Sequence, residues 1–195
     1  MKLAMAEAIA QELLGYFAPV CDRIEIAGSV RRQKKEVKDI EIVYIPSVGH
    51  RAVDLFGTEE PYRLPDVTLR NLERMDILVP DQRVKRWGDK YKRAVHVASG
   101  MVVEMFAADA DNWGYILALR TGPADFNKLL VTPQVYGGAL PFGRRVNGGY
   151  VWGSREIVPV PEEEQFFAEV GVPCWPPEER SKAKLALYLH ERGRR

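Results

Sequence analysis

The chain has 195 residues, and 46% of them are hydrophobic. A chain of this length and composition can bury the core of one domain, or of a catalytic domain with a small appendage. The formal net charge is only +1, so affinity for nucleic acid would have to come from local basic clusters. Cys21 and Cys174 stand far apart, which argues against a disulfide framework and predicts reduced thiols in an intracellular, cytoplasmic protein. No segment reaches the roughly 18 uninterrupted apolar residues of a membrane span, so no membrane partner is expected.

The first half of the chain predicts a helix followed by strands. Apolar residues at three- and four-residue spacing predict a helix over Lys2–Phe17, which Pro19 ends. A short strand over Arg23–Ala27 then leads into a tight turn at Gly28-Ser29. The clearest strand is Asp39–Ile45, where polar and apolar residues alternate before a run of branched residues. The less regular stretch that follows contains two further predicted elements, a helix over Val67–Met75 and a strand over Asp76–Val79.

The second half begins with a basic segment, Arg83–Arg93, in which aromatic residues are interleaved. Two apolar strands follow, Ala94–Val97 and Met101–Phe106, with Ser99-Gly100 as the hairpin turn between them. A polar break at Asp109–Asn112 predicts a first domain over residues 1–111 and a second over residues 112–195. The remaining predicted elements are helices over Trp113–Leu119, Asp125–Val131 and Pro161–Val170 and a hairpin with its turn at Asn147-Gly148.

Three acidic residues are predicted to share one face of a sheet. Asp39 and Glu41 stand two residues apart on the clearest strand, so their side chains point the same way. Glu104 lies on the strand Met101–Phe106, and if the two strands are neighbours the three carboxylates meet. Three negative charges repel one another without cations, and magnesium prefers oxygen ligands on a rigid support. The pattern therefore indicates a metal site, whereas an isolated Asp-x-Glu is more often a solvated pair.

The turn before the acidic strand has the features of an anion site. Gly28 permits close approach of the backbone to an anion, and the Ser29 hydroxyl can donate to phosphate oxygens. Arg32, together with Arg31, offers fork-shaped donors that suit a triphosphate. A charged run such as Arg31–Lys35 is usually a solvated loop. Its place between the Gly-Ser turn and the acidic strand favours phosphate binding instead.

These motifs, taken in order, resemble family X DNA polymerases, the DNA polymerase beta group. The stretches that carry the resemblance are Ala27–Arg32, Asp39–Val43, Val103–Phe106, Arg120–Lys128 and the carboxy-terminal part from Ser154 to Arg180. The first two are similar to the catalytic signature of the family, and Glu104 stands where the family keeps its third metal-binding carboxylate. Arg120–Lys128 resembles the nucleotide-pocket motif. The resemblance covers nearly the whole chain and is weakest over residues 46–83.

The resemblance implies an α/β (α+β) fold, with a nucleotidyltransferase palm on a mixed sheet and a small carboxy-terminal α/β nucleotide-binding subdomain. It implies a DNA-directed DNA polymerase that extends a primer 3′-hydroxyl by a two-metal mechanism, in short-gap repair synthesis. Asp39, Glu41 and Glu104 would bind two Mg²⁺ ions, with Mn²⁺ as a substitute, and Glu104 would also serve the attacking hydroxyl. The implied nucleotide-binding residues are Gly28, Ser29, Arg32, Thr121, Gly122 and Asn127. Of these, Thr121 and Gly122 would lie against the sugar and Asn127 at the minor-groove edge of the base.

The implied partners are nucleoside triphosphates and primer-template or gapped DNA, bound by a monomer. The chain starts at the helix before the catalytic strand, so it resembles the stripped-down viral type of the family. No lyase activity is expected, and the origin would be bacterial, archaeal or viral. The basic residues expected to contact DNA phosphates are Lys85, Arg86, Lys90, Lys92, Arg93, Arg144 and Arg145. The tail Arg180–Arg195 is a further candidate, and a solvated charged face is the ordinary alternative for each segment.

The chain departs from the family pattern at several positions. The family usually has Asp where this chain has Glu41 and Glu104, and the extra methylene shifts oxygens whose position matters for in-line phosphoryl transfer. Lys38 replaces a common glycine. Leu119-Arg120 replaces aromatic residues before Thr-Gly, which predicts tolerance of ribonucleotides. Two rival interpretations stay open: template-independent nucleotide transfer to another acceptor, and a catalytically impaired DNA-binding module.

Overall fold

The computed structural model describes residues 1–54, 57–84 and 87–193. The chain forms two compact units, the first from Met1–Ile26 and Lys35–Ala108 and the second from Ala27–Lys34 and Asp109–Arg195. The change of unit after Ala108 lies close to the boundary predicted between residues 111 and 112. The segment Ala27–Lys34 belongs to the second unit although it stands between two strands of the first, and the sequence pattern did not predict this.

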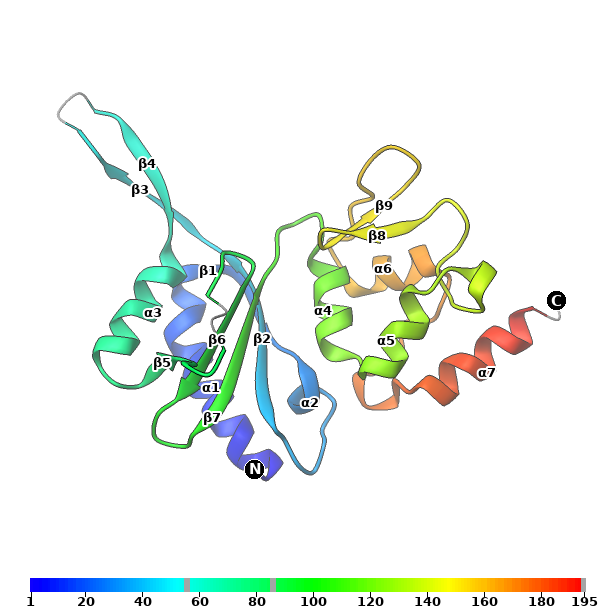
Figure 1. Ribbon diagram of the computed structural model, residues 1–195, viewed down its shortest axis with the longest axis horizontal. Coiled ribbons are helices and arrows are strands. Elements are labelled where there is room, and N and C mark those ends of the chain that lie inside the picture. Colours follow the sequence, from blue (N-terminus) through cyan, green and yellow to red (C-terminus); the bar gives the residue numbers. More distant parts are fainter. Residues whose placement is uncertain (55–56, 85–86, 194–195) are drawn as a thin grey trace. The chain divides into compact units, whose positions relative to one another are not determined.

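Within the described residues, five strands form the mixed sheet of the first unit (Figure 1). Their order is β1-β2-β7-β6-β5, with β2 and β7 parallel and the other neighbours antiparallel. The bounds of these strands are Cys21–Ile26 (β1), Asp39–Pro46 (β2), Leu78–Pro80 (β5), Tyr91–His96 (β6) and Met101–Ala107 (β7). Strand β6 begins at Tyr91 rather than at Ala94, so it includes the end of the segment predicted as a basic surface.

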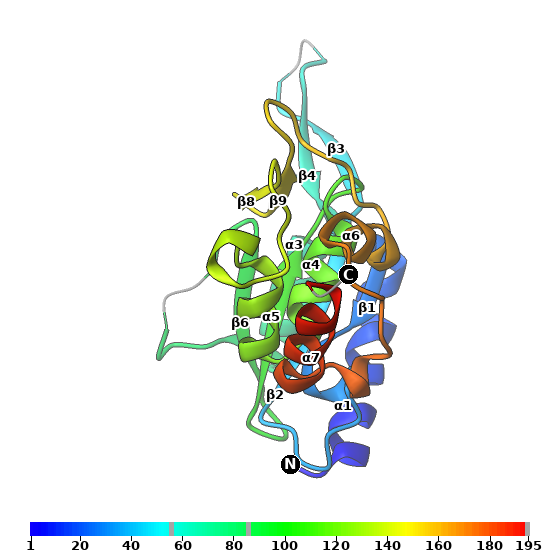
Figure 2. The same cartoon turned by 90° about the vertical axis from the view of Figure 1, so that its right-hand side faces the viewer.

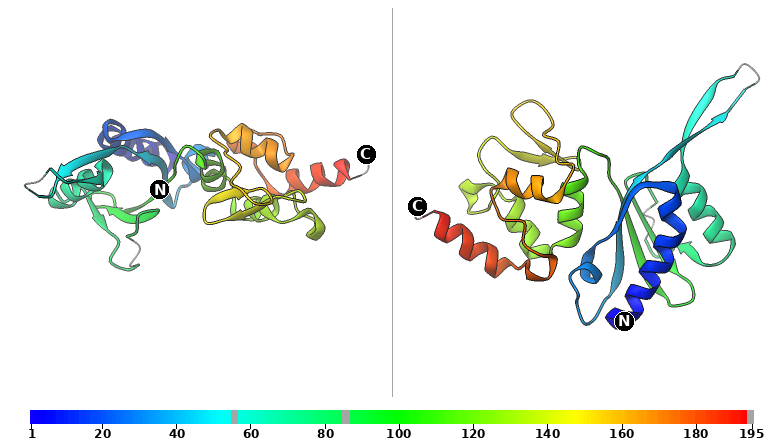
Figure 3. Two further views of the ribbon diagram at one scale, coloured as in Figure 1. Left: turned by 90° about the horizontal axis from the view of Figure 1, so that it is seen from above. Right: turned by 180° about the vertical axis from the view of Figure 1, so that it is seen from behind.

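Two helices, α1 (Leu3–Phe17) and α3 (Leu64–Arg74), pack together over one face of this sheet (Figure 3). The buried apolar residues of this layer include Ala6, Ala10, Leu13 and Phe17 of α1, Leu69 and Leu72 of α3, and Ile40, Ile42, Val103 and Met105 of the sheet. Side chains alternate along a strand, so the neighbours of these sheet residues point to the other face. The helices therefore leave the opposite face of the sheet to Asp39, Glu41 and Glu104.

A β-hairpin that the sequence pattern did not predict extends from the first unit (Figure 1). Its strands, β3 (Val48–Ala52) and β4 (Glu59–Arg63), pair antiparallel, and none of their residues is buried among those described. Because neither face packs on a core, no alternation of apolar and polar residues marks the strands. Pro61 within β4 lowers the strand propensity further. The absence of a sequence signal thus follows from the exposure of the hairpin.

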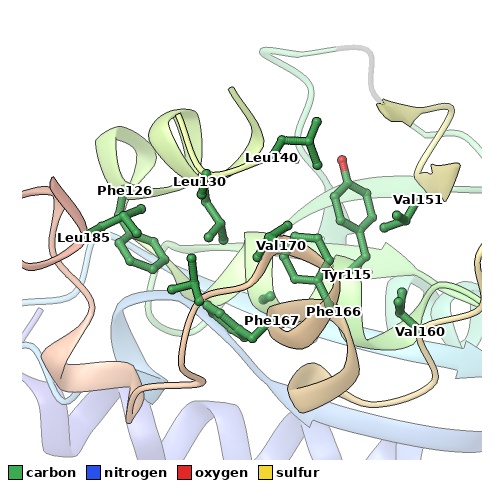
Figure 4. Packing of buried hydrophobic residues seen from close by; sticks show 13 residues of the cluster. Tyr115, Phe126, Leu130, Leu140, Val151, Val160, Phe166, Phe167, Val170 and Leu185 are labelled. Atoms are coloured by element: carbon green, nitrogen blue, oxygen red, sulfur yellow. The ribbon is translucent and has the colours of Figure 1, made fainter. Parts of the chain in front are cut away.

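The second unit is mainly helical, and Figure 2 shows α7 beside α5. Its elements are α2 (Gly28–Arg31), α4 (Trp113–Thr121), α5 (Ala124–Val131), β8 (Arg145–Asn147), β9 (Tyr150–Trp152), α6 (Glu163–Val170) and α7 (Lys182–Arg192). Figure 4 shows its apolar core, in which the rings of Tyr115 and Phe166 meet edge to face at a centroid distance of 5.2 Å. Leu185 of α7 is fully buried in this core. Short 3-10 turns in the chain lie at Ala18–Val20, Gln134–Tyr136 and Pro177–Glu179.

The predicted fold class is confirmed: the chain combines helices with a mixed sheet in an α+β arrangement. None of the helices in the described part of the chain has the length and apolar character that a membrane crossing requires.

Candidate active site

The carboxylates predicted as catalytic lie on neighbouring parallel strands of the first unit. In the register of β2 and β7, Glu41 is opposite Glu104 and Asp39 is opposite Val102. Partners in register point to the same face, and Asp39 and Glu41 are two residues apart. All three carboxylates therefore belong to one face of the sheet, where their side chains are half-buried.

Glu104 is held by two residues of β6, the strand on the other side of β7. Arg93 lies opposite Glu104 in the antiparallel register, and its Nη1 donates to Glu104 Oε1 over 2.7 Å. The Tyr91 hydroxyl donates to the same oxygen over 2.5 Å. The ring of Tyr91 stacks on Phe106 at a centroid distance of 5.0 Å, which fixes the direction of that hydroxyl. Glu104 is thus restrained by a charged and a neutral donor.

Arg93 is bonded on its other side to Asp81, whose side chain is only 1% exposed. Arg93 Nε donates to Asp81 Oδ2 over 2.9 Å, and Arg83 donates from Nε and Nη2 to the two oxygens over 2.8 and 3.0 Å. These hydrogen bonds, first from Arg83 and then from Arg93, hold the pKa of Asp81 well below its usual range. The bond to Asp81 in turn raises the pKa of Arg93. Charges therefore alternate along Arg83, Asp81, Arg93 and Glu104.

The chemistry of the three carboxylates suits a hard divalent cation, because magnesium prefers carboxylate oxygens on a rigid support. Among residues 1–54, 57–84 and 87–193, however, no three acidic, histidine or cysteine side chains are arranged to hold a metal ion. Glu104 Oε1 already accepts hydrogen bonds from Arg93 and Tyr91. Metal binding by all three carboxylates would require a change at this oxygen or use of Oε2.

The turn predicted to bind phosphate belongs to the second unit. Gly28 has a φ of +63°, a left-handed conformation that favours glycine, and it begins the short helix α2. Ser29 Oγ is buried and has no hydrogen-bond partner among the described residues. Leaving a buried hydroxyl without a partner costs roughly 1–3 kcal/mol. The Ser29 hydroxyl therefore has unused hydrogen-bonding capacity inside the second unit.

Both arginines of this segment bind Thr121, the last residue of α4. Arg31 Nη1 donates to Thr121 Oγ1 over 2.9 Å, and Arg32 Nη1 donates to the Thr121 carbonyl oxygen. Thr121 is fully buried. The structure thus brings together two predicted nucleotide-binding residues, Arg32 and Thr121. Arg31 also binds Thr121.

A buried ion cluster behind Arg31 was not predicted. Glu163 Oε2 accepts from Arg31 over 2.8 Å, and Glu163 Oε1 accepts from Arg180 over 2.6 Å. Burial raises the pKa of Glu163, but the hydrogen bonds from Arg180 and Arg31 outweigh it, so the pKa lies below its ordinary value. Arg180 is 3% exposed and its guanidinium lies over the ring of Phe167 at 4.8 Å. Arg180 belongs to the core, contrary to its prediction as part of a solvated or DNA-binding tail.

Gly122 and Asn127 lie against each other between α4 and α5. Asn127 Nδ2 donates to the carbonyl oxygens of Leu119 and Gly122 over 2.6 and 2.8 Å. A Cβ at position 122 would stand 2.1 Å from Asn127 Oδ1, so the close approach requires glycine. Base pairs present acceptors in the minor groove, and both donors of this amide are already used. A base contact by Asn127 would therefore require these bonds to open.

The predicted basic segment before β7 does not form one exposed surface. Lys85 and Arg86 lie outside the described residues, and Lys90 is exposed. Lys92 is only 3% exposed, and its Nζ donates to the Gly88 carbonyl oxygen over 3.0 Å. The early start of β6 places Lys92 on the helix-covered face, where it pairs with Asp66 at 3.1 Å. The expectation of surface DNA contacts is therefore wrong for Lys92, and Arg93 is shared between two carboxylates.

The other predicted DNA contacts, Arg144 and Arg145, lie at the β8–β9 hairpin. Arg144 Nε pairs with Glu169 Oε2 at 2.6 Å. Arg145 is exposed and opposite Trp152 in the register, with its guanidinium carbon 4.9 Å from the centre of the indole ring. Within the described part of the chain, Arg145 has no carboxylate partner. Arg145 is therefore the better placed of the two to contact a phosphate.

No protein-family model matches this chain, and no curated protein matches it. The resemblance to family X polymerases stays a prediction from the order of short motifs.

Proposed function

We propose that this protein is a metal-dependent nucleotidyltransferase that extends the 3′-hydroxyl of a DNA primer on a template, in short-gap repair synthesis. The observation that carries the proposal is the position of Asp39, Glu41 and Glu104 on one face of two adjacent strands. Three carboxylates on one face make a region of negative charge that favours a bound cation. A site for Mg²⁺, with Mn²⁺ as substitute, accounts for it.

The first unit would supply the groups at the reacting atoms. Asp39, Glu41 and Glu104 would hold the metal ions, which when bound supply positive charge to the phosphates and lower the pKa of the attacking hydroxyl. Glu104 would take the proton of the primer 3′-hydroxyl while the oxygen of that hydroxyl forms a bond to the α-phosphorus. The bond from that phosphorus to the bridging oxygen breaks, and pyrophosphate leaves.

The second unit would supply donors to the triphosphate and a close surface for the sugar. The buried hydroxyl of Ser29 lacks a partner among the described residues, which supports a role in binding phosphate oxygens. Arg32 is anchored on Thr121 and would add a fork-shaped donor. Gly122, which has no space for a side chain, would lie against the sugar. Arg145 and Lys90 would contact DNA phosphates.

A DNA-binding protein without catalysis is the rival that a specific observation favours. Glu104 is paired with Arg93, and no three-ligand metal group is present in the part of the chain that the structure describes. Both hypotheses require binding of DNA, and only the polymerase requires incorporation of nucleotides.

Labelled-nucleotide incorporation on a gapped template separates the two. We expect extension with Mg²⁺ or Mn²⁺, loss of extension with a chelator, and loss in an Asp39→Ala variant that still binds DNA. Extension without a template would show transfer of the template-independent kind. Failure with both metals, combined with DNA binding that weakens steeply with salt, would leave the non-catalytic module.

A further inference from the structure

A row of three charged side chains crosses the sheet, and its last member is a cation. Glu41 of β2 is opposite Glu104 of β7, and Glu104 is opposite Arg93 of β6. Side chains in register on neighbouring strands share a face and interact. The guanidinium of Arg93 therefore stands next to one of the predicted metal ligands, where a positive charge is most favourable.

Arg93 is tethered independently of Glu104. Its Nε donates to Asp81 over 2.9 Å, whereas the bond to Glu104 comes from Nη1. Asp81 is 1% exposed and is also bound by Arg83, so this anchor is buried and has a second charged partner. Because the two bonds use different nitrogen atoms, the bond to Glu104 can break while Asp81 keeps Arg93 in place.

The contacts on Glu104 also leave one of its oxygens open. Arg93 and Tyr91 both donate to Oε1, and Oε2 accepts no hydrogen bond from the described residues. Glutamate has one more rotatable bond than the aspartate usual in similar polymerases. Two donors on one oxygen restrain that extra freedom.

We propose that Arg93 is a positioning residue that acts as the counter-ion of Glu104 at the metal site. In the metal-free protein Arg93 neutralises and orients Glu104, and it competes with the metal ion for that carboxylate. This inference rests on the proposed function. Removing the positive charge should make the metal-free protein less stable, since Glu104 and Asp81 each lose a partner. It should also tighten metal binding, by about tenfold, because a competing charge is removed beside the site.

Binding of Mn²⁺, followed through the electron paramagnetic resonance signal of the free ion, tests this without an activity assay. We expect Arg93→Met to lower the Kd about tenfold and Arg93→Lys, which keeps the charge, to stay within about threefold of the original protein. Arg83→Met is the matched control, since it removes a bond to Asp81 but none to Glu104, and its Kd should not change. The double variant Arg93→Met with Asp81→Asn also removes the buried negative charge that loses one of its two arginine partners. It should show the same tightening, which guards against misfolding of the single variant.

An Arg93→Met protein that binds Mn²⁺ no more tightly than the original would overturn the role of Arg93 and leave the polymerase proposal standing. Absence of Mn²⁺ binding in both proteins would overturn the metal-dependent function itself, and with it this inference. The two failures are therefore distinguishable.

Discussion

Replacing Glu163 by glutamine is expected to destabilise the second unit strongly. The carboxylate is 6% exposed and lies between Arg180, which is 1% exposed at its side chain, and Arg31, which is 23% exposed. Removing one partner of a buried ion pair costs about 3–5 kcal/mol. Gln keeps one acceptor and Arg31 is partly solvated, so we expect a loss of about 3 kcal/mol in the free energy of unfolding at pH 7.

The contribution of the Glu163 carboxylate to the free energy of unfolding is expected to depend on pH. Because the pKa of Glu163 is lowered in the folded protein, its stabilisation is complete above the unfolded value of about 4.3. It is lost as the pH falls below that value and through the folded pKa. The difference between the original protein and Glu163→Gln should therefore be full at pH 7 and shrink below about pH 4.3.

Urea unfolding followed by tryptophan fluorescence measures the effect, since Trp113, Trp152 and Trp175 lie in the second unit. Glu164→Gln is the matched control, because Glu164 is exposed beside Glu163, and it should change stability by less than about 0.5 kcal/mol. A loss below about 1 kcal/mol at pH 7, or a loss that does not vary with pH, would refute the argued role of the buried cluster.

Three further substitutions test other parts of the second unit. Ser29→Ala should leave stability unchanged or raise it by up to about 1 kcal/mol, because the hydroxyl has no partner among the described residues, while calorimetry should show about tenfold weaker triphosphate binding. Gly122→Ala should cost about 2 kcal/mol in urea unfolding, because the new Cβ meets Asn127, whereas Gly15→Ala, with open space around it, should be neutral or slightly stabilising. Arg145→Ala should reduce the slope of log K against log salt for DNA binding by about 1, and an unchanged slope would exclude a phosphate contact.

Elements with one buried face were predictable, and elements without one were not. The alternation over Asp39–Ile45 and the helical spacing over Lys2–Phe17 correspond to β2 and α1, because both elements pack on the core. The β3–β4 hairpin is exposed on both faces and gave no signal. The sequence of helix α7 predicts a charged tail rather than a packed helix, because Leu185 is its one buried residue among those described.

The pairing of Glu104 with Arg93 depends on a register that the sequence pattern did not fix. A two-residue turn at Ser99-Gly100 would pair Ala98 with Met101 and place Val95 opposite Glu104. In the structure four residues, Val97–Gly100, connect β6 to β7 instead of two, and His96 pairs with Met101. The register therefore moves by two residues, which preserves the face on which each side chain lies. The face of the sheet on which Glu104 lies does not depend on this shift. Its partner on β6 does, because Arg93 rather than Val95 lies opposite Glu104.

The segment Ala27–Lys34, which carries the turn predicted to bind phosphate, belongs to the second unit. Gly28-Ser29 and the acidic strand are close in the chain, and this closeness predicts that they act together. The contacts of Arg31 instead reach Thr121 and Glu163, which are 90 and 132 positions away, and no local pattern reveals them. Loss of the Glu163 carboxylate should therefore weaken triphosphate binding together with stability, since the segment that carries Ser29 loses an anchor. Ser29→Ala should weaken triphosphate binding alone, so the two variants separate a group that would touch the ligand from one that holds it in place.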